Sequence, residues 1–371
     1  MQKKLKFTVE KTKGNARAGI IELNGHKIPT PVFMPVGTKA TIKGMILDML
    51  QDPKYVGDIP TINLILANTY HLFLRPGSEM VKKAGGLHKY ENRPWLILTD
   101  SWGFQVFSLG LSKTWKSLAN LRDEWVYFRS IHDGTKHFFS PEIVVDTQCA
   151  LGSDIMMVLD VCSPPGVTAK KFKQHMFLTH KRAKQAFDHF MPMYDDVRGV
   201  LFPIVQWGTN LELREESLTY LSQFAHDGIA VGGVSVGESQ EEIKKVVDFC
   251  GPKLPKDKPR YLMGIGNPEG ISNAVASGFD MFDCVLPTRL GRHGMYYTDQ
   301  GYQKINHSRN KENLDRLTND CPCFACQNFT KAYLHHLHRE KEMLGGILLT
   351  LHNIVYLQRL TAKLRQDILD S

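Results

Sequence analysis

The sequence lacks several features that mark common classes of protein. It has no apolar run of membrane-spanning length, and its opening residues, MQKKLKFTVEK, lack the apolar core of a signal peptide. It also lacks internal repeats and low-complexity linkers. We therefore expect no membrane association. At 371 residues the chain can form one large α/β domain or two smaller ones.

Cysteine is scarce, and its distribution argues against a disulfide framework. There are seven cysteines, an odd number, and three of them are clustered. Such a pattern predicts reduced thiols with a bound metal, and hence a cytoplasmic protein. The net charge of +8 suits a polyanionic partner such as a nucleic acid, although many basic proteins bind none.

Short apolar runs recur along the chain and predict parallel strands. Eight runs qualify, at residues 31–36, 63–67, 95–99, 155–159, 201–205, 228–231, 261–265 and 281–286. Helix-compatible segments such as 168–191 and 211–225 lie between most of them, and residues 7–25 have the pattern of a hairpin. Eight strand–helix units predict an α/β fold of the (β/α)8 TIM-barrel type.

Polar residues follow several of these runs. They are Asn68, Asp100, Asp160 and Gln206. The sixth run leads into Gly233, the seventh carries Met263 and Gly264, and the eighth carries Asp283. In a barrel the carboxyl ends of the strands meet on one face, where such enzymes build their sites. The alternative is that Asn68 or Asp100 simply caps a following helix.

The segment 281–294, MFDCVLPTRLGRHG, combines a carboxylate with two cations. Asp283 lies inside an apolar run, where an unpaired carboxylate is costly unless it has a function. Arg289 and Arg292 follow within nine residues and can bind anions. The alternative is an ion-paired aspartate beside a turn.

The spacing C-x-C-x-x-C, at Cys321, Cys323 and Cys326, indicates a metal site. Three thiolates and one imidazole form a closed tetrahedral zinc site, which is structural rather than catalytic. On spacing alone the histidine is open, because His335, His336 and His338 are nearer in sequence than His352, although those three also suit a solvated helix face. The glycines between residues 263 and 270 match neither nucleotide-binding fingerprint.

Several segments together resemble one known family. They are ILANTYHLFLRPG, LTDSWGFQVFSLG, LGSDIMMVLD, IVQWG, VGGVSVGE, YLMGIGNPE, FDCVLPTRLGR and CPCFAC followed by LGGILLTLHN, in order over residues 31–352. These motifs are similar to those of bacterial-type catalytic chains of the tRNA-guanine transglycosylase (queuine tRNA-ribosyltransferase) family. The resemblance implies exchange of the wobble guanine of GUN-anticodon tRNAs for a 7-deazaguanine base, in a cytoplasmic homodimer.

The resemblance also assigns roles to individual residues. It implies that Asp283 is the nucleophile of a covalent tRNA intermediate and that Asp100 is the acid/base. The remaining implied roles are base binding by Asp160, Gln206 and Gly233, stacking on the base by Phe104 and Met263, contact with flanking bases by Arg289 and Arg292, and one zinc ion on Cys321, Cys323, Cys326 and His352. The implied domains are a hairpin and barrel at 1–305, a zinc subdomain at 306–352, and a C-terminal helix packing back on the barrel at 353–371.

The sequence departs from the family pattern near the implied base pocket. Trp102 and Trp207 stand where glycines are usual, Val234 where leucine is usual, and Val161 where bacterial members carry an acidic residue. Bacterial members take 7-aminomethyl-7-deazaguanine, and eukaryotic members take queuine. The departures predict a preference shifted towards queuine. Drift without a change of preference is the alternative.

Two other functions fit parts of the sequence. A zinc-dependent barrel hydrolase would need histidines at strand ends, but His71 is the only clear one. A non-catalytic tRNA-binding subunit would be expected to lose catalytic or base-binding residues, whereas Asp100, Asp160 and Asp283 are all present. Both are weaker predictions than base exchange.

Overall fold

The computed structural model of the protein describes residues 4–60, 62–101, 103, 119–121, 126–163, 168–234 and 237–371. In these ranges, no helix combines the length and the apolar character needed to cross a bilayer. Phe104 and Trp102, two residues of interest from the sequence, lie outside the described residues.

Parallel strands form two sheets, with strand orders β11-β10-β6-β5 and β12-β13-β14-β15-β4. Their bounds are β4 (Val32–Pro35), β5 (Leu64–Asn68), β6 (Leu96–Asp100), β10 (Ile155–Met157), β11 (Val200–Phe202), β12 (Ile204–Val205), β13 (Ile229–Val231), β14 (Arg260–Leu262) and β15 (Met281–Cys284). Most of these residues are buried, so apolar runs rather than alternating patterns mark the strands. Every predicted run overlaps an observed strand, which confirms a parallel α/β architecture.

The two sheets approach each other at two places. Val36 forms an isolated parallel bridge with Leu66, and Gly37 N donates to Leu66 O at 2.7 Å. At the second place, only Pro203 separates β11 from β12. The prediction of one strand at 201–205 is therefore wrong. Proline has no N–H to donate, and β11 pairs with β10 whereas β12 pairs with β13.

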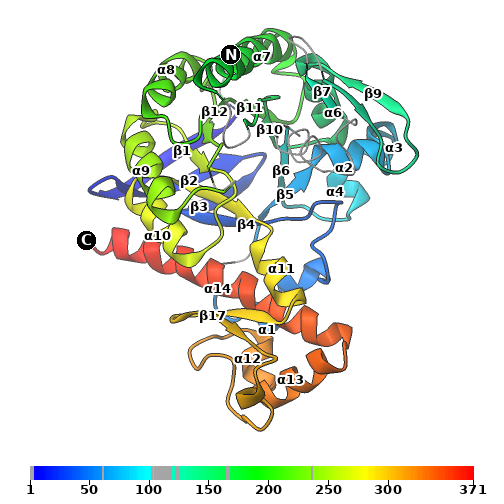
Figure 1. The fold of residues 1–371 in the computed structure, drawn as a ribbon, viewed down its shortest axis with the longest axis vertical. Helices are drawn as coiled ribbons and strands as arrows, with labels where there is room; N and C mark the ends of the chain where they lie inside the picture. Colours follow the sequence, from blue (N-terminus) through cyan, green and yellow to red (C-terminus); the bar gives the residue numbers. More distant parts are fainter. Residues whose placement is uncertain are drawn as a thin grey trace.

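The longer helices surround these strands (Figure 1). They are α6 (Pro141–Leu151), α7 (Ala169–Phe190), α8 (Leu211–Ser222), α9 (Gln240–Cys250) and α10 (Pro268–Ala276). The helical segments predicted at 168–191 and 211–225 correspond to α7 and α8. Side chains of Thr168 and Asn210 cap their first turns, and Ser239 begins α9 with a capping box.

Shorter helices fill the remaining connections. They are α1 (Pro53–Val56), α2 (Thr69–Leu74), α3 (Ser78–Lys83), α4 (Leu87–Tyr90), α11 (Leu286–Arg292) and the 3-10 turns η1 (Leu47–Leu50), η2 (Met191–Met193), η3 (Gly251–Lys253) and η4 (Ser308–Asn310). Of these, α2 and α11 matter most for function, because they begin at the carboxyl ends of β5 and β15.

Three antiparallel sheets supplement the parallel ones. The N-terminal sheet contains β1 (Lys6–Lys13), β2 (Ala16–Leu23) and β3 (His26–Thr30), so the predicted hairpin is confirmed as part of a three-stranded sheet. The others are β7 (Ala119–Leu121), β8 (Val126–Arg129) and β9 (Lys136–Phe139), and the hairpin of β16 (Met295–Thr298) and β17 (Gly301–Lys304). The sequence did not predict the β7–β9 sheet, because all three of its strands are only three or four residues long, too short for a clear periodic pattern.

The C-terminal part contains α12 (Phe324–Asn328), α13 (Lys331–Arg339) and the long helix α14 (Met343–Leu369). Figure 1 shows α14 running from the α12–α13 region to the N-terminal sheet. Gln358 Nε2 donates to Phe33 O of β4 at 2.6 Å, and Arg365 Nη1 donates to Gly19 O and Thr30 O, both at 2.8 Å. Helix α14 continues through residues 352 and 353, where the sequence placed a boundary. The three-part division of the chain stays a prediction.

Candidate functional site

Asp100 ends β6 and is held by the neighbouring strand and helix. Asn68, which pairs with Asp100 in the β5–β6 register, donates from Nδ2 to Asp100 Oδ2 at 2.5 Å. Thr69 N, at the start of α2, donates to Asp100 Oδ1 at 3.1 Å. The cap of α2 is Asn68, whose Oδ1 accepts from His71 N at 3.0 Å. Asn68 is therefore a helix cap, as the alternative interpretation supposed. Asp100 is not the cap residue of α2, because it ends the neighbouring strand β6.

Asp283 lies in β15, and among the described residues only one of its carboxylate oxygens accepts hydrogen bonds. Tyr261 Oη donates to Asp283 Oδ1 at 2.6 Å, and Gly264 N donates to the same oxygen at 2.8 Å. Among the described residues no cation forms an ion pair with this carboxylate, so the ion-paired alternative is not supported. Sequence reasoning missed Tyr261. The one feature that could have indicated it is a phenol hydroxyl in an otherwise apolar run.

The electrostatics of the two carboxyl groups differ. Burial, together with the negative charges of Asp283 and Asp160, raises the pKa of Asp100 to about 7, although hydrogen bonds from Thr69 and Asn68 oppose the shift. The pKa of Asp283 is also raised by burial, but its hydrogen bonds from Tyr261 and Gly264 oppose the shift. Asp100 and Asp283 lie at the carboxyl ends of β6 and β15, and Asp160 follows the carboxyl end of β10. Like charges in a partly buried site favour a proton on one of them at neutral pH.

Asp160 follows β10 and is 5% exposed. Its Oδ1 accepts from Ser101 Oγ at 3.1 Å, and its Oδ2 accepts from Gln206 Nε2. Burial raises the pKa of Asp160, and these hydrogen bonds oppose that shift. A Cβ on Gly103 would lie 1.9 Å from Asp160 Oδ1, so only glycine fits beside this carboxylate. Gln206 Oε1 is buried and has no hydrogen-bond partner among the described residues.

Gly233 and Met263 follow the next two strands, β13 and β14. Gly233 has φ of +66°, and a Cβ there would lie 2.2 Å from Gln206 Oε1. A Cβ on Gly232 would lie 3.3 Å from Met263 Sδ, so the thioether lies beside this glycine pair. The structure thus brings Asp160, Gln206, Gly233 and Met263 together at the carboxyl ends of the strands.

Arg214 of α8 also supports these segments, and sequence reasoning missed it. This fully buried guanidinium donates from Nε to Gly208 O at 2.7 Å and from Nη2 to Gly232 O at 3.0 Å. It therefore ties the segments after β12 and β13 together. Burial lowers its pKa, but an arginine remains protonated in proteins.

Trp207 does not extend into solvent. Its side chain is 1% exposed and its ring packs edge-on against Phe172 of α7, with centroids 5.8 Å apart. Its backbone has φ of +110°, a conformation that favours glycine. The side chain of Val234 is also buried, in the main core.

Arg289 and Arg292 lie in the last turn of α11, which starts three residues after Asp283. Both side chains are exposed, and among the described residues neither forms an ion pair. Arg292 Nε donates to Thr288 O at 3.1 Å. Both cations are therefore available to anions that approach the carboxyl end of β15.

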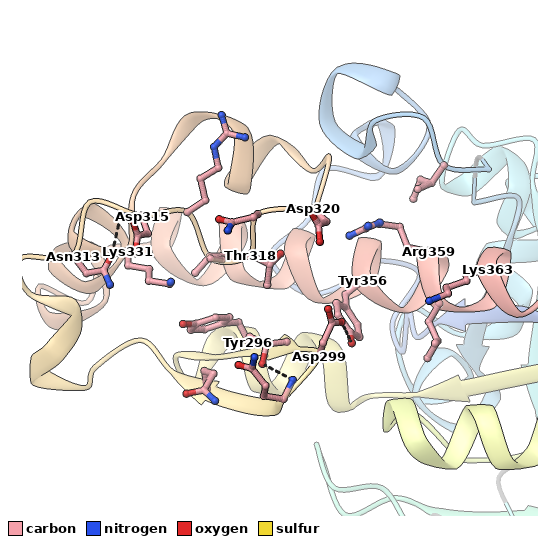
Figure 2. A pocket seen from close by; sticks show the side chains of 18 of the residues that line it. Tyr296, Asp299, Asn313, Asp315, Thr318, Asp320, Lys331, Tyr356, Arg359 and Lys363 are labelled. Carbon is pink, nitrogen blue, oxygen red and sulfur yellow. Dashed lines mark hydrogen bonds between the residues drawn. The ribbon is translucent and has the colours of Figure 1, made fainter.

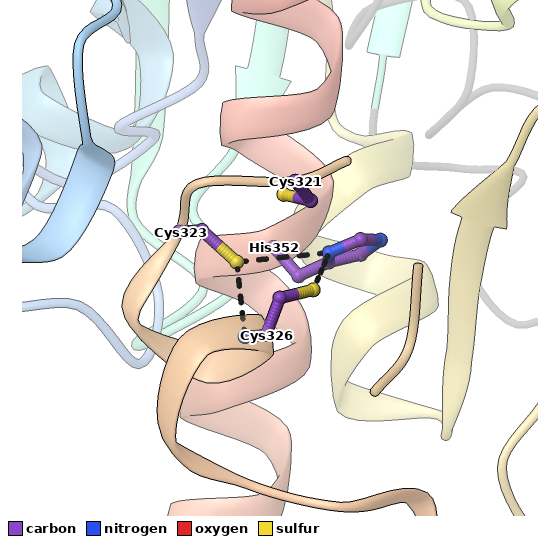
Figure 3. A group of neighbouring side chains, drawn as sticks. All are labelled: Cys321, Cys323, Cys326 and His352. Atoms are coloured by element: carbon purple, nitrogen blue, oxygen red, sulfur yellow. Dashed lines mark hydrogen bonds between the residues drawn. The ribbon is translucent and has the colours of Figure 1, made fainter. Parts of the chain in front are cut away.

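Cys321, Cys323, Cys326 and His352 form a fully buried cluster whose ligand atoms lie within 4.8 Å of one another (Figure 3). The thiols precede or begin α12, and the imidazole comes from α14. His352 Nε2 donates to Tyr297 O at 2.9 Å, because a carbonyl can only accept. This bond leaves the lone pair of Nδ1 facing the sulfurs, 3.3 Å from Cys326 Sγ. The cluster is positioned to bind a metal ion.

In the described part of the chain, His352 is the histidine that joins the three thiols. His335, His336 and His338 belong to α13 and lie outside the cluster. Four buried protein ligands fill a tetrahedral site and leave no position for water, which disfavours a metal-dependent hydrolase.

A cavity of about 1090 Å³ lies between α14, the β16–β17 hairpin and the segment before α12 (Figure 2). Five cations line it, namely Arg309, Arg316, Lys331, Arg359 and Lys363. Four carboxylates line it too, namely Asp58, Asp299, Asp315 and Asp320. The positive and negative charges in the cavity therefore nearly balance. None of the site residues described in the preceding paragraphs lines it.

Comparison with known proteins agrees with this geometry. The family described as "TGT: Queuine tRNA-ribosyltransferase" matches residues 11–371. Proteins named "Queuine tRNA-ribosyltransferase" from Acinetobacter baumannii (strain ACICU) and Acinetobacter baylyi are 45% and 44% identical, over 99% and 98% of this chain and 93% and 91% of theirs. One from Chromobacterium violaceum is 46% identical over 98% of this chain and 94% of its own. The chain belongs to the queuine tRNA-ribosyltransferase family of transferase enzymes.

Proposed function

We propose that this protein exchanges the wobble guanine of tRNAs with GUN anticodons for a 7-deazaguanine base, either queuine or its aminomethyl precursor. One observation carries the proposal within the family. Asp100 and Asp283 lie at strand ends of the two sheets and differ in hydrogen bonding, so one carboxyl can carry a proton while the other attacks.

In the first half of the reaction, Asp283 attacks the ribose. Tyr261 and Gly264 both occupy Oδ1, so Oδ2 is the oxygen that forms the bond to C1′. The glycosidic bond to guanine breaks through an oxocarbenium-like state, and its electron pair leaves with the base. Asp100, with its pKa raised to about 7, transfers its proton to the leaving guanine.

In the second half, the ionised Asp100 accepts a proton from the ring nitrogen of the incoming base. That nitrogen forms the new bond to C1′, and the ester bond to Asp283 breaks. Two displacements retain the configuration at C1′, as exchange of bases on one sugar requires. The phosphate backbone is never cut.

Asp160, Gln206 and Gly233 bind the edge of the base in this proposal. The buried Oε1 of Gln206 has no described partner, and a guanine N–H would satisfy it. Met263 stacks on one face of the ring and Phe104 on the other. An unpaired anticodon base can be turned out of its stack to reach such a pocket.

The remaining parts follow from the same proposal. The two parallel sheets form one closed (β/α)8 barrel through the contacts at Val36–Leu66 and Pro203. Cys321, Cys323, Cys326 and His352 hold a structural zinc ion, which would cross-link the segment before α12 to α14. Arg289 and Arg292 contact the anticodon loop beside the reacting nucleotide. The protein acts as a homodimer in the cytoplasm, where thiols stay reduced.

A base-exchange assay tests this function. Labelled guanine should enter a GUN-anticodon tRNA, and excess aminomethyl-deazaguanine or queuine should expel it. The same tRNA with adenosine at the wobble position should take up no label. A folded, metal-loaded protein that incorporates no guanine would refute the proposal and favour a non-catalytic tRNA-binding subunit.

Base preference is the finer part of the proposal. Val234 is smaller than the leucine usual there, so we expect a preference for queuine over the aminomethyl base, and a smaller preference in Val234→Leu. A difference of one or two methylene groups discriminates by about 1–3 kcal/mol. The measurement is the ratio of kcat/KM for the two bases. A wild-type preference of tenfold or more for the aminomethyl base, about 1.4 kcal/mol, would contradict the expectation.

A further inference from the structure

The β7–β9 sheet has one buried and one exposed face. On its inner face Val126, Phe128 and Phe139 are at most 2% exposed. On its outer face lie Tyr127 and Arg129 of β8 and Lys136 and Phe138 of β9, which we call the outer platform. The base-exchange chemistry described above does not use these four residues.

The register of the sheet pairs like with like on the outer platform. Tyr127 lies opposite Phe138, with ring centroids 5.4 Å apart, and the two residues are 46% and 37% exposed. Arg129 lies opposite Lys136, and these two residues form the next outward-facing pair of the ladder. An exposed aromatic pair thus adjoins an exposed pair of cations.

Folding alone explains only half of this arrangement. A cross-strand aromatic pair stabilises a sheet, but two like charges directly opposite each other destabilise it. Among the described residues, no carboxylate forms an ion pair with Arg129 or Lys136. The turn carboxylate Asp133 instead accepts from Thr135 N at 3.1 Å. A polyanion bound at this face would remove the repulsion between the two cations.

The sheet is anchored at the reactive end of the strands. Its inner face packs in one apolar cluster with Tyr70 of α2 and with Leu159, the neighbour of Asp160. Helix α2 begins at Thr69, which donates to Asp100. Figure 1 shows β9 beside α2 and α3. The outer platform is therefore carried by a sheet that packs directly on the elements holding Asp100 and Asp160.

We propose that the outer platform binds the RNA substrate, with unpaired bases stacking on Tyr127 and Phe138 and phosphates contacting Arg129 and Lys136. Adjacent aromatic rings and cations are the combination that binds single-stranded nucleic acid. The inference rests on the proposed function, because it presumes an RNA substrate with unpaired nucleotides.

Direct RNA binding tests the proposal without catalysis. The probe is a fluorescent GUN-anticodon tRNA without free base, and the Kd is measured by anisotropy. Threonine keeps the strand propensity, so the test variant is Tyr127→Thr with Phe138→Thr. We expect its Kd to rise about tenfold or more because bases can no longer stack there, while its Tm stays near wild type. The control is Phe177→Thr, which removes an aromatic side chain 52% exposed on α7 and should leave the Kd unchanged.

A second variant tests the cations separately. Arg129→Gln with Lys136→Gln should lower the slope of log Kd against log salt concentration by roughly 0.7 to 0.9 for each phosphate that a cation no longer neutralises. A Kd within twofold of wild type in the aromatic variant, with an unchanged salt slope in the cation variant, would overturn the proposal. In that case base exchange by the wild type would still support the proposed function. Wild-type protein that binds the tRNA but exchanges no base would refute the proposed function alone.

Discussion

At the scale of single residues, the site depends on an asymmetry between two aspartates. Asp283 has one oxygen held by two donors and one oxygen without a described partner. Asp100 has both oxygens held, by Asn68 and Thr69, and burial, with smaller contributions from the charges of Asp283 and Asp160, raises its pKa to about 7. A nucleophile needs an available oxygen, whereas an acid/base needs a pKa near the working pH.

Replacing the nucleophile tests its assignment. Asp283→Asn should lose base exchange and the covalent RNA adduct, because an amide oxygen attacks C1′ too weakly. The adduct is measured on a denaturing gel after mixing enzyme with tRNA. Asp188→Asn is the control, since this exposed aspartate of α7 pairs with Lys184 on the same helix. An Asp283→Asn protein that still traps tRNA covalently would assign the nucleophile elsewhere.

The raised pKa of Asp100 predicts a pH dependence. The leaving guanine takes a proton from Asp100, so the rate of adduct formation should fall as the pH rises through about 7. Single-turnover rates between pH 5.5 and roughly 9 measure this limb of the profile. In Asp100→Asn the rate should be low throughout and the limb should vanish. A limb of the same midpoint in Asp100→Asn would assign the titration to another group.

At the scale of elements, the metal cluster joins two segments that are far apart in sequence. Cys323 caps α12 by accepting from Cys326 N, and His352 is oriented by the carbonyl of Tyr297 in β16. Hydrogen bonds to the second ring nitrogen are the usual means of orienting a histidine ligand. A bound metal would therefore stabilise the contact of α12 and β16 with α14.

Removing one thiol should remove both metal and stability. Cys323→Ala is expected to purify with less than one zinc ion per chain and to unfold at a lower urea concentration, because binding free energy of a structural zinc contributes to folding. Elemental analysis and urea titration measure the two effects. Cys149→Ala, a thiol outside the cluster, is the control. Well-folded wild type without zinc would end this idea.

At the scale of the whole molecule, α14 connects the metal cluster with the N-terminal sheet. Its first half carries His352, and its second half donates to the backbone of β2, β3 and β4 through Gln358 and Arg365. One helix thus runs through two of the predicted parts of the chain and forms hydrogen bonds with the third.

Cutting these long-range hydrogen bonds should destabilise the whole fold. Arg365→Met leaves Gly19 O and Thr30 O without their charged donor, at a cost of about 1–3 kcal/mol in the free energy of unfolding. Urea titration measures this change. Lys363→Met, an exposed neighbour on α14, should stay within about 0.5 kcal/mol of wild type. Equal stability of both variants would mean that these bonds contribute little.

Features that are local in the chain could be predicted from the residues alone. Buried parallel strands require apolar runs, so the runs revealed the strands, and the spacing of Cys321, Cys323 and Cys326 revealed the thiol ligands of the metal cluster. The groups that meet across long separations in the chain became known only from the folded structure. Tyr261 on Asp283, Asn68 on Asp100 and His352 among the thiols depend on strand register and helix packing. The pKa of Asp100 depends on burial and on two other carboxylates, and the outer platform on the pairing of β8 with β9. These properties arise from distances in space, which no single stretch of sequence contains.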